Sequence, residues 1–97
     1  MQGSLVYSDT AVASTDGSIS VGHHTDYIAF WNKNSATDAV VKLNNQFSVL
    51  IPHTPTTAAG TYTKIYGDYT KFEVITTSVE LSVFAVGWFC INYIINV

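Results

Sequence analysis

Apolar and polar residues alternate along two short stretches near the middle of the chain, and this pattern predicts β-strands. The residues expected to point inward are Ala39, Val41 and Leu43 in the first stretch and Phe47, Val49 and Ile51 in the second. Asn44-Asn45-Gln46 separates the two stretches. Asparagine tolerates the positive φ that a tight hairpin turn requires. The sequence therefore predicts a β-hairpin with strands over 38–44 and 47–51.

Similar patterns occur along the rest of the chain. The inward residues Val79, Leu81, Val83 and Ala85 alternate with Glu80, Ser82 and Phe84. Residues 26–32 carry bulk at both sets of alternating positions, which is typical of a central sandwich strand. Weaker patterns predict strands at 4–8, 18–21, 62–66 and 70–76. No window has a sustained apolar period of 3.6, so we expect no helix.

Turn signals lie between these segments, at Asp16-Gly17, 32–35, 52–55 and Gly67-Asp68. Short strands at this spacing favour a two-sheet architecture. We therefore expect one all-β domain over 1–97, folded as a small antiparallel β-sandwich or a jelly-roll-like barrel. The longest polar loop, 52–61, is a candidate for exposed function, and it contributes His53 as an interface candidate.

Charge narrows the classes of partner. The 97 residues have a net charge of −3, and all four basic residues are lysines. Phosphate and guanine recognition normally uses a basic patch with arginine, so we expect no nucleic-acid partner. A polybasic membrane face is missing for the same reason. The first residues lack the features of a secretory signal, and the apolar run 83–91 is too short to span a bilayer as a helix. These features predict a soluble protein made in the cytoplasm, with no membrane partner.

The residue types that carry chemistry are scattered. His23-His24, followed by Asp26, is the only cluster of possible metal ligands, and no zinc-type spacing accompanies it. There is no Gly-x-Ser-x-Gly elbow and no glycine-rich phosphate loop. Cys90, the only cysteine, has apolar neighbours and is expected to be buried and unreactive. We expect no catalytic residues, no metal and no cofactor, and hence no enzyme.

Aromatic residues give the first interface candidates. Tyr62, Tyr66 and Tyr69 lie close together around Gly67-Asp68. Aromatic groups with polar tips suit protein or sugar recognition. Ordinary cross-strand packing would give the same pattern, and the sequence leaves both interpretations open.

The end of the chain is the most apolar segment. Over 88–97, one set of alternating positions reads Phe89, Ile91, Tyr93, Ile95, Val97, and the other reads Trp88, Cys90, Asn92, Ile94, Asn96. A free edge of this kind would aggregate, so the segment should be central in a sheet or paired with another chain. Trp88, Phe89, Ile91, Tyr93 and Ile95 are therefore further interface candidates.

The order of these segments resembles small structural proteins of tailed phages. The resemblance is carried by 27–35, 39–44 and 47–52, read as strand, Asn-rich turn, strand, short turn and strand ending at Pro52, and by a late Val-rich strand ending at Gly87. It implies a virion structural protein, most simply a capsid cement or decoration protein. Such a protein would form a homo-oligomer, bind other virion chains such as the major capsid protein, and reside in the virion. The alternative is a carbohydrate- or receptor-binding module of a tail or fibre, using the tyrosines with Trp31 or Trp88.

The apolar end of the chain yields a prediction. Truncation after Gly87 removes several large apolar side chains, each worth about 1.5–3 kcal/mol when fully buried. Since domains of this kind are stable by about 5–15 kcal/mol, we expect the shortened chain to unfold, aggregate or fail to assemble. Circular dichroism and sedimentation velocity would check this. A truncated chain with unchanged melting temperature and oligomer size would contradict it.

Overall fold

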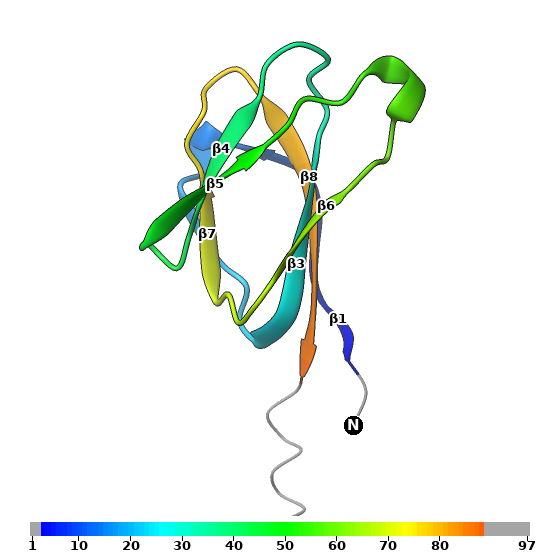
Figure 1. Ribbon diagram of the computed structural model, residues 1–97. Coiled ribbons are helices and arrows are strands. Elements are labelled where there is room, and N and C mark those ends of the chain that lie inside the picture. The colour runs from blue at the N-terminus through cyan, green and yellow to red at the C-terminus, as the bar shows by residue number, and fades with distance from the viewer. Residues whose placement is uncertain (1–2, 89–97) are drawn as a thin grey trace, which may run out of the picture.

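Two four-stranded antiparallel sheets pack face to face in the computed structural model, which describes residues 3–88 (Figure 1). The first sheet has the order β1 (Ser4–Ala13), β8 (Glu80–Trp88), β3 (His24–Asn32) and β6 (Thr63–Tyr66). The second has the order β2 (Ser18–Ser20), β7 (Lys71–Val74), β4 (Ala39–Leu43) and β5 (Phe47–Ile51). Two single-turn 3₁₀ helices, η1 (Ser14–Asp16) and η2 (Thr56–Ala58), lie in the connections. The β-sandwich expected from the sequence is confirmed.

The hairpin and the two central strands form where the sequence predicts them. β4 and β5 pair along their whole length, and the turn between them places Asn44 and Asn45 at φ of 54° and 58°. β3 and β8 occupy the interior of the first sheet. β1 is longer than the predicted strand 4–8, because it remains paired with β8 through two register shifts. Its second half is mostly exposed, and therefore lacks the apolar alternation that would reveal it.

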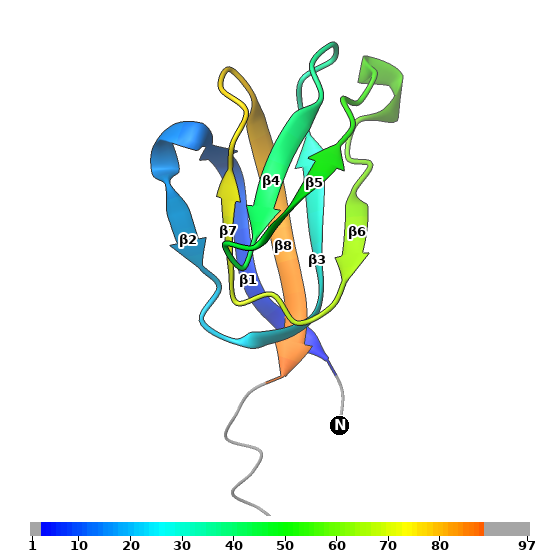
Figure 2. The ribbon, with the colours of Figure 1, turned by 60° about the vertical axis from the view of Figure 1, so that its left-hand side comes forward.

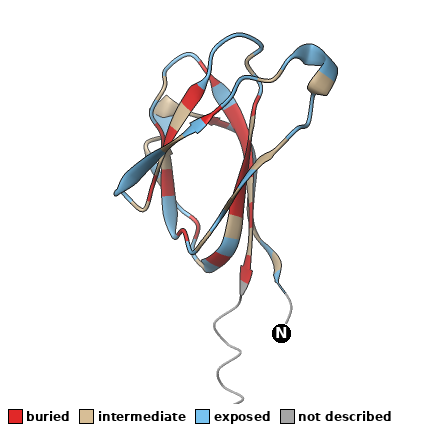
Figure 3. Ribbon diagram, in the orientation of Figure 1, coloured by how far each residue is buried: buried red, intermediate tan, exposed pale blue. Residues whose placement is uncertain are grey.

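The core lies between the sheets, where buried residues of both line the interior (Figure 3). Phe30 of β3 and Phe72 of β7 meet edge to face, with ring centroids 5.6 Å apart. Tyr7 of β1 contacts the same Phe72 ring at 5.7 Å. Edge-to-face aromatic pairs add to the gain from burial, so Phe72 joins the sheets at their centre.

The predicted inward set of the hairpin is confirmed except at Phe47, the first residue of β5. Ala39, Val41 and Leu43 of β4 are fully buried, as is Ile51 of β5. Phe47 stays 44% exposed, although its ring lies 6.0 Å from that of Tyr69. The reason is position: β5 is an edge strand of the second sheet, so no further strand covers its first residue.

Buried polar groups fix the two ends of β3. At its C-terminal end, Asn32 is fully buried, and its Nδ2 donates to the carbonyls of Thr37 and Ile51 at 2.9 and 3.1 Å. At the other end, Thr25 Oγ1 donates to the Gly67 carbonyl and accepts from the Tyr69 amide, both at 2.7 Å. Each contact links the first sheet to a loop or strand outside it, so β3 sets the spacing of the two layers.

Replacing Asn32 tests this arrangement. Asn32→Asp removes the two donors and leaves two carbonyls without them, which should lower the free energy of unfolding by at least about 1–3 kcal/mol. Asn45→Asp makes the same chemical change at an exposed turn position and serves as the control. Urea unfolding of both variants gives the comparison. Equal stabilities would show that the Asn32 amide does not hold the layers together.

Candidate functional site

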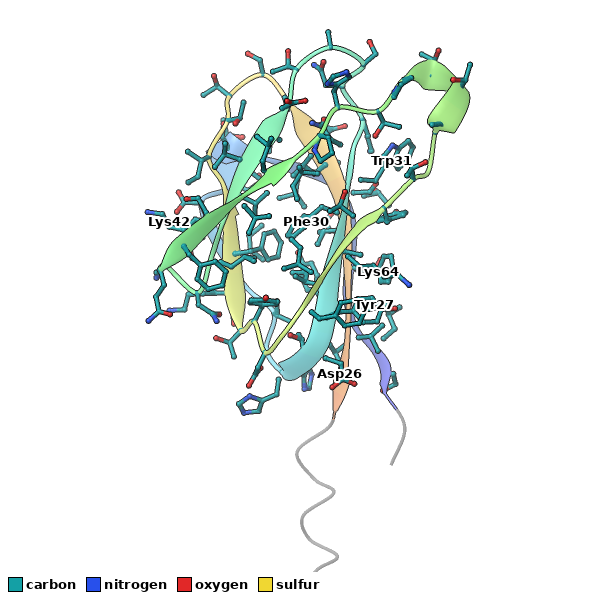
Figure 4. The ribbon with its side chains drawn as sticks, in the orientation of Figure 1. Asp26, Tyr27, Phe30, Trp31, Lys42 and Lys64 are labelled. Carbon is teal, nitrogen blue, oxygen red and sulfur yellow. The ribbon has the colours of Figure 1, made fainter. Side chains whose placement is uncertain are left out.

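Five aromatic side chains gather on the outer face of the first sheet. In β3, Ile28 and Phe30 point into the core, so Tyr27 and Trp31 point outward. The same alternation in β8 turns Phe84 outward. We call the group the outer aromatic face, and define it as Tyr27, Trp31, Tyr62, Tyr66 and Phe84. Figure 4 shows Tyr27 and Trp31 on the side of β3 away from the core, whereas Phe30 lies between the sheets.

The five rings form a continuous chain of contacts across β3, β6 and β8. Centroid separations are 5.3 Å for Tyr66 and Tyr27, and 6.0 Å for Tyr27 and Phe84. They are 4.9 Å for Phe84 and Tyr62, and 6.2 Å for Tyr62 and Trp31. All lie in the range typical of aromatic pairs. The face is therefore a packed layer of its own on the far side of the sheet from the core.

This layer is thick enough to bury small residues beneath it. Ala29 lies between Tyr27 and Trp31 on the outward side of β3, yet it is fully buried. Ser82 on β8 is also buried, and its Oγ donates to the Thr10 carbonyl at 3.3 Å. Outward-facing positions of a solvated sheet are normally polar and exposed. Their burial shows that the outer aromatic face excludes water from part of the sheet surface.

Lysines accompany the rings. Lys64 Nζ lies 5.1 Å from the centre of the Tyr27 ring, and Lys33 Nζ lies 5.9 Å from that of Trp31. Lys33 also approaches Glu80 Oε1 at 3.6 Å and donates to the Thr10 carbonyl. Cations over aromatic faces are stabilising at these distances. The outer aromatic face thus combines apolar rings with positive charge.

The structure divides the tyrosines predicted as interface candidates. Tyr62 and Tyr66 belong to the outer aromatic face, and Tyr66 is 69% exposed. Tyr69 is 7% exposed and donates its hydroxyl to the Tyr66 carbonyl at 2.8 Å. It lies in the core, so its ring adds nothing to an outer surface. Packing in the core accounts for Tyr69, and recognition through Tyr62 and Tyr66 stays a prediction.

The remaining candidates lie elsewhere or outside the described residues. The backbone of Trp88 ends β8, where it pairs with His24. Phe89, Ile91, Tyr93 and Ile95 lie outside the described residues, as does Cys90. Tyr27 and Phe84 were not predicted as site residues. The signal that could have identified Tyr27 was the run of large side chains at both sets of alternating positions in 26–32. A central strand places such side chains on both faces of its sheet.

His53 is held to the segment before β4. Asp38 Oδ1 accepts a hydrogen bond from the His53 amide at 2.9 Å and lies 2.6 Å from His53 Nδ1. The backbone hydrogen bond, with the ring contact second, holds the pKa of Asp38 below its ordinary value of 3.8. This pair ties the start of the 52–61 loop to the base of the hairpin.

A small hollow at the opposite end of the sandwich holds the other histidines. Its lining is Ser20, Gly22, His23, His24 and Thr70. His24 Nδ1 lies 2.6 Å from Asp68 Oδ2, and the other oxygen of Asp68 accepts from the Thr25 amide at 3.0 Å. Both side chains of the His24–Asp68 pair are more than half exposed. Across residues 3–88, no group of three or more His, Cys, Asp or Glu side chains is placed to hold a metal ion.

Comparison of the chain with known protein families, with curated proteins and with solved structures found no match. Within residues 3–88 no helix has the length and apolar character needed to cross a membrane. Since the comparisons point to no site, the outer aromatic face is the candidate site because of its geometry alone.

The Asp38–His53 pair predicts an acid dependence of stability. A carboxyl whose pKa is lowered in the folded state contributes stability above its ordinary pKa and loses it as the pH falls through the folded value. The melting temperature of the wild type should therefore fall more steeply below about pH 4 than that of Asp38→Asn. Glu73→Gln, which removes an acidic group from β7, is the control. Identical pH profiles for wild type and Asp38→Asn would refute the assignment.

Proposed function

We propose that this chain is a non-catalytic virion structural protein, a capsid cement or decoration protein, that binds another virion protein through its outer aromatic face. One observation carries the proposal: a layer of five aromatic rings covers the outside of a sheet where polar residues would suffice. Tyrosine and tryptophan are the residues most enriched among those that dominate the energy of protein interfaces.

The surroundings of the face favour a protein as partner. Leu5 of neighbouring β1 is 59% exposed, which extends the apolar surface beyond the rings. Lys64 and Lys33 add charges, and interfaces of this kind combine an apolar centre with a polar rim. Contiguous exposed apolar patches on soluble proteins often mark interaction sites. A sheet face of this composition suits a broad protein surface such as a capsid subunit.

The virion context is supported by the sequence. The order of strands and Asn-rich turns resembles that of small structural proteins of tailed phages, and only 11% of the residues are charged. A major capsid protein is the partner that this resemblance implies.

A carbohydrate- or receptor-binding role is the second candidate, and the exposure of Tyr66 favours it. At 69% exposure, the Tyr66 ring and hydroxyl are available for stacking on a sugar. The other rings contact one another at tilted or edge-on angles and do not form one flat stacking platform. This geometry suits a protein surface better than an extended glycan.

Mass spectrometry of purified particles from the natural source of the chain tests the proposal. We expect the chain in many copies per particle, and we expect purified protein to rebind particles stripped of it. Tyr66→Ser should weaken rebinding by about tenfold or more, equivalent to about 1.4 kcal/mol. Ile75→Ser, at a 41% exposed apolar position after β7, is the matched control.

The same two variants separate the candidate functions. Binding to a glycan array that is lost in Tyr66→Ser, without any binding to particles, would favour the second candidate. Absence of the chain from particles, or equal rebinding by both variants, would overturn the first.

A further inference from the structure

The four edge strands of the sandwich differ in how well they are protected against pairing with another chain. β1 carries two register shifts against β8, and β2 is only three residues long. Bulges and short length are the common protections of an exposed edge. β5 and β6 pair with their neighbours without a register shift. Figure 2 shows β5 and β6 along one side of the sandwich, so the unprotected edges share that side.

β5 is the more open of these two edges. Its sequence, Phe47-Ser-Val-Leu-Ile51, contains no charged residue, whereas β6 contains Lys64. Leu50 is 57% exposed and Phe47 is 44% exposed. Every second residue of an edge strand directs its backbone N–H and C=O away from the sheet. β5 thus offers both backbone hydrogen bonds and uncovered apolar side chains to an added strand.

The pairing at the end of β8 bears on which segment fills the free edge of β5. Gly87 pairs with Ser4, the first residue of β1, and Trp88 pairs with His24, the first residue of β3. Within residues 3–88, neither β1 nor β3 has a strand residue beyond these two partners. Nine residues remain in the sequence, 89–97, and they contain no charge, no glycine and no proline.

We propose that residues 89–97 of one copy add as a strand to the free edge of β5 in a second copy. Nine extended residues span about 30 Å, ample for the five residues of β5, which span about 17 Å. The alternating set Phe89, Ile91, Tyr93, Ile95 and Val97 would cover the inward side of that edge, over Phe47 and Val49. Neither strand carries a charge, so no like-charge repulsion opposes the pairing. This inference concerns self-association, and it stands whether or not the chain belongs to a virion.

Oligomer mass is the first test. Sedimentation equilibrium of the full-length chain at micromolar concentration should show an oligomer. Ile95→Asp should weaken association by about tenfold or more, because it places a carboxylate on the face that becomes buried. Asn96→Asp adds the same charge at the neighbouring, oppositely directed position, and it should associate like wild type. A monomeric wild type, or equal loss in both variants, would overturn the proposal.

Cross-linking through the only cysteine locates the contact. Two double variants, Ser48→Cys/Cys90→Ser and Leu50→Cys/Cys90→Ser, each carry one thiol on β5 and none at position 90. Each is mixed with wild type and mildly oxidised. At least one mixture should give a disulfide between two chains, from Cys90 of the wild type to the thiol on β5. A disulfide requires Cα atoms about 4.4–6.8 Å apart, so it reports adjacency. The controls are Ser18→Cys and Ser20→Cys. Both lie at exposed positions of β2, the opposite edge strand of the same sheet.

Three outcomes of the cross-linking would overturn the proposal. A link to the β2 thiols would place the segment on the opposite side. A disulfide within one chain, formed by Ser48→Cys or Leu50→Cys with Cys90 retained, would identify the same copy as the donor. A wild-type oligomer with no link to either β5 position would remove β5 as the acceptor. A wild-type chain that self-associates but does not bind particles would count against the proposed function alone.

Discussion

Phe30 of β3 packs against Phe72 of β7 at the point where the two sheets meet, and the other features of the sandwich are arranged around that contact. β3 carries Phe30 on its inner side and pairs with β8 and β6 on its two edges. Its ends are fixed by Thr25 and Asn32, whose side chains bond to segments outside the strand. With the strand fixed at its centre and both ends, its outward residues are presented on a rigid support.

That rigidity bears on recognition. Tyr27 and Trp31 are held by the same strand that forms the core, so ordering them on binding costs little conformational entropy. Tyr62 and Tyr66 come from β6 and the segment before it, and they contact rings of β3 and β8. The outer aromatic face is thus largely preformed. The β5 edge is a different kind of surface, because it offers backbone groups where the aromatic face offers side chains.

The sequence predicted the strands wherever side chains alternate strongly. The β4–β5 hairpin and β8 follow a period of two, β3 carries large side chains at both sets of positions, and Asn44 and Asn45 marked the turn correctly. The second half of β1 could not be predicted, since its exposed residues and register shifts remove the alternation. The residues of the candidate site were harder to predict from the sequence. Tyr66 and Tyr69 are three residues apart and similar in context, yet one is exposed and the other is in the core. Only the path of the turn at Gly67-Asp68 separates them, and that path depends on contacts with Thr25 in a distant strand.

The position of β8 has a consequence for how the protein is made. β8 lies between β1 and β3, although among residues 3–88 it is the last strand and β1 is the first. During synthesis β1 emerges with no partner, and it must wait until residues 80–88 have left the ribosome. Folds dominated by such distant pairings form slowly, because loop closure must precede the gain from contact. The second sheet is complete earlier, since β2, β4, β5 and β7 all precede Glu80. β1 and the edge of β3 that faces β8 therefore stay unpaired until residues 80–88 insert between them.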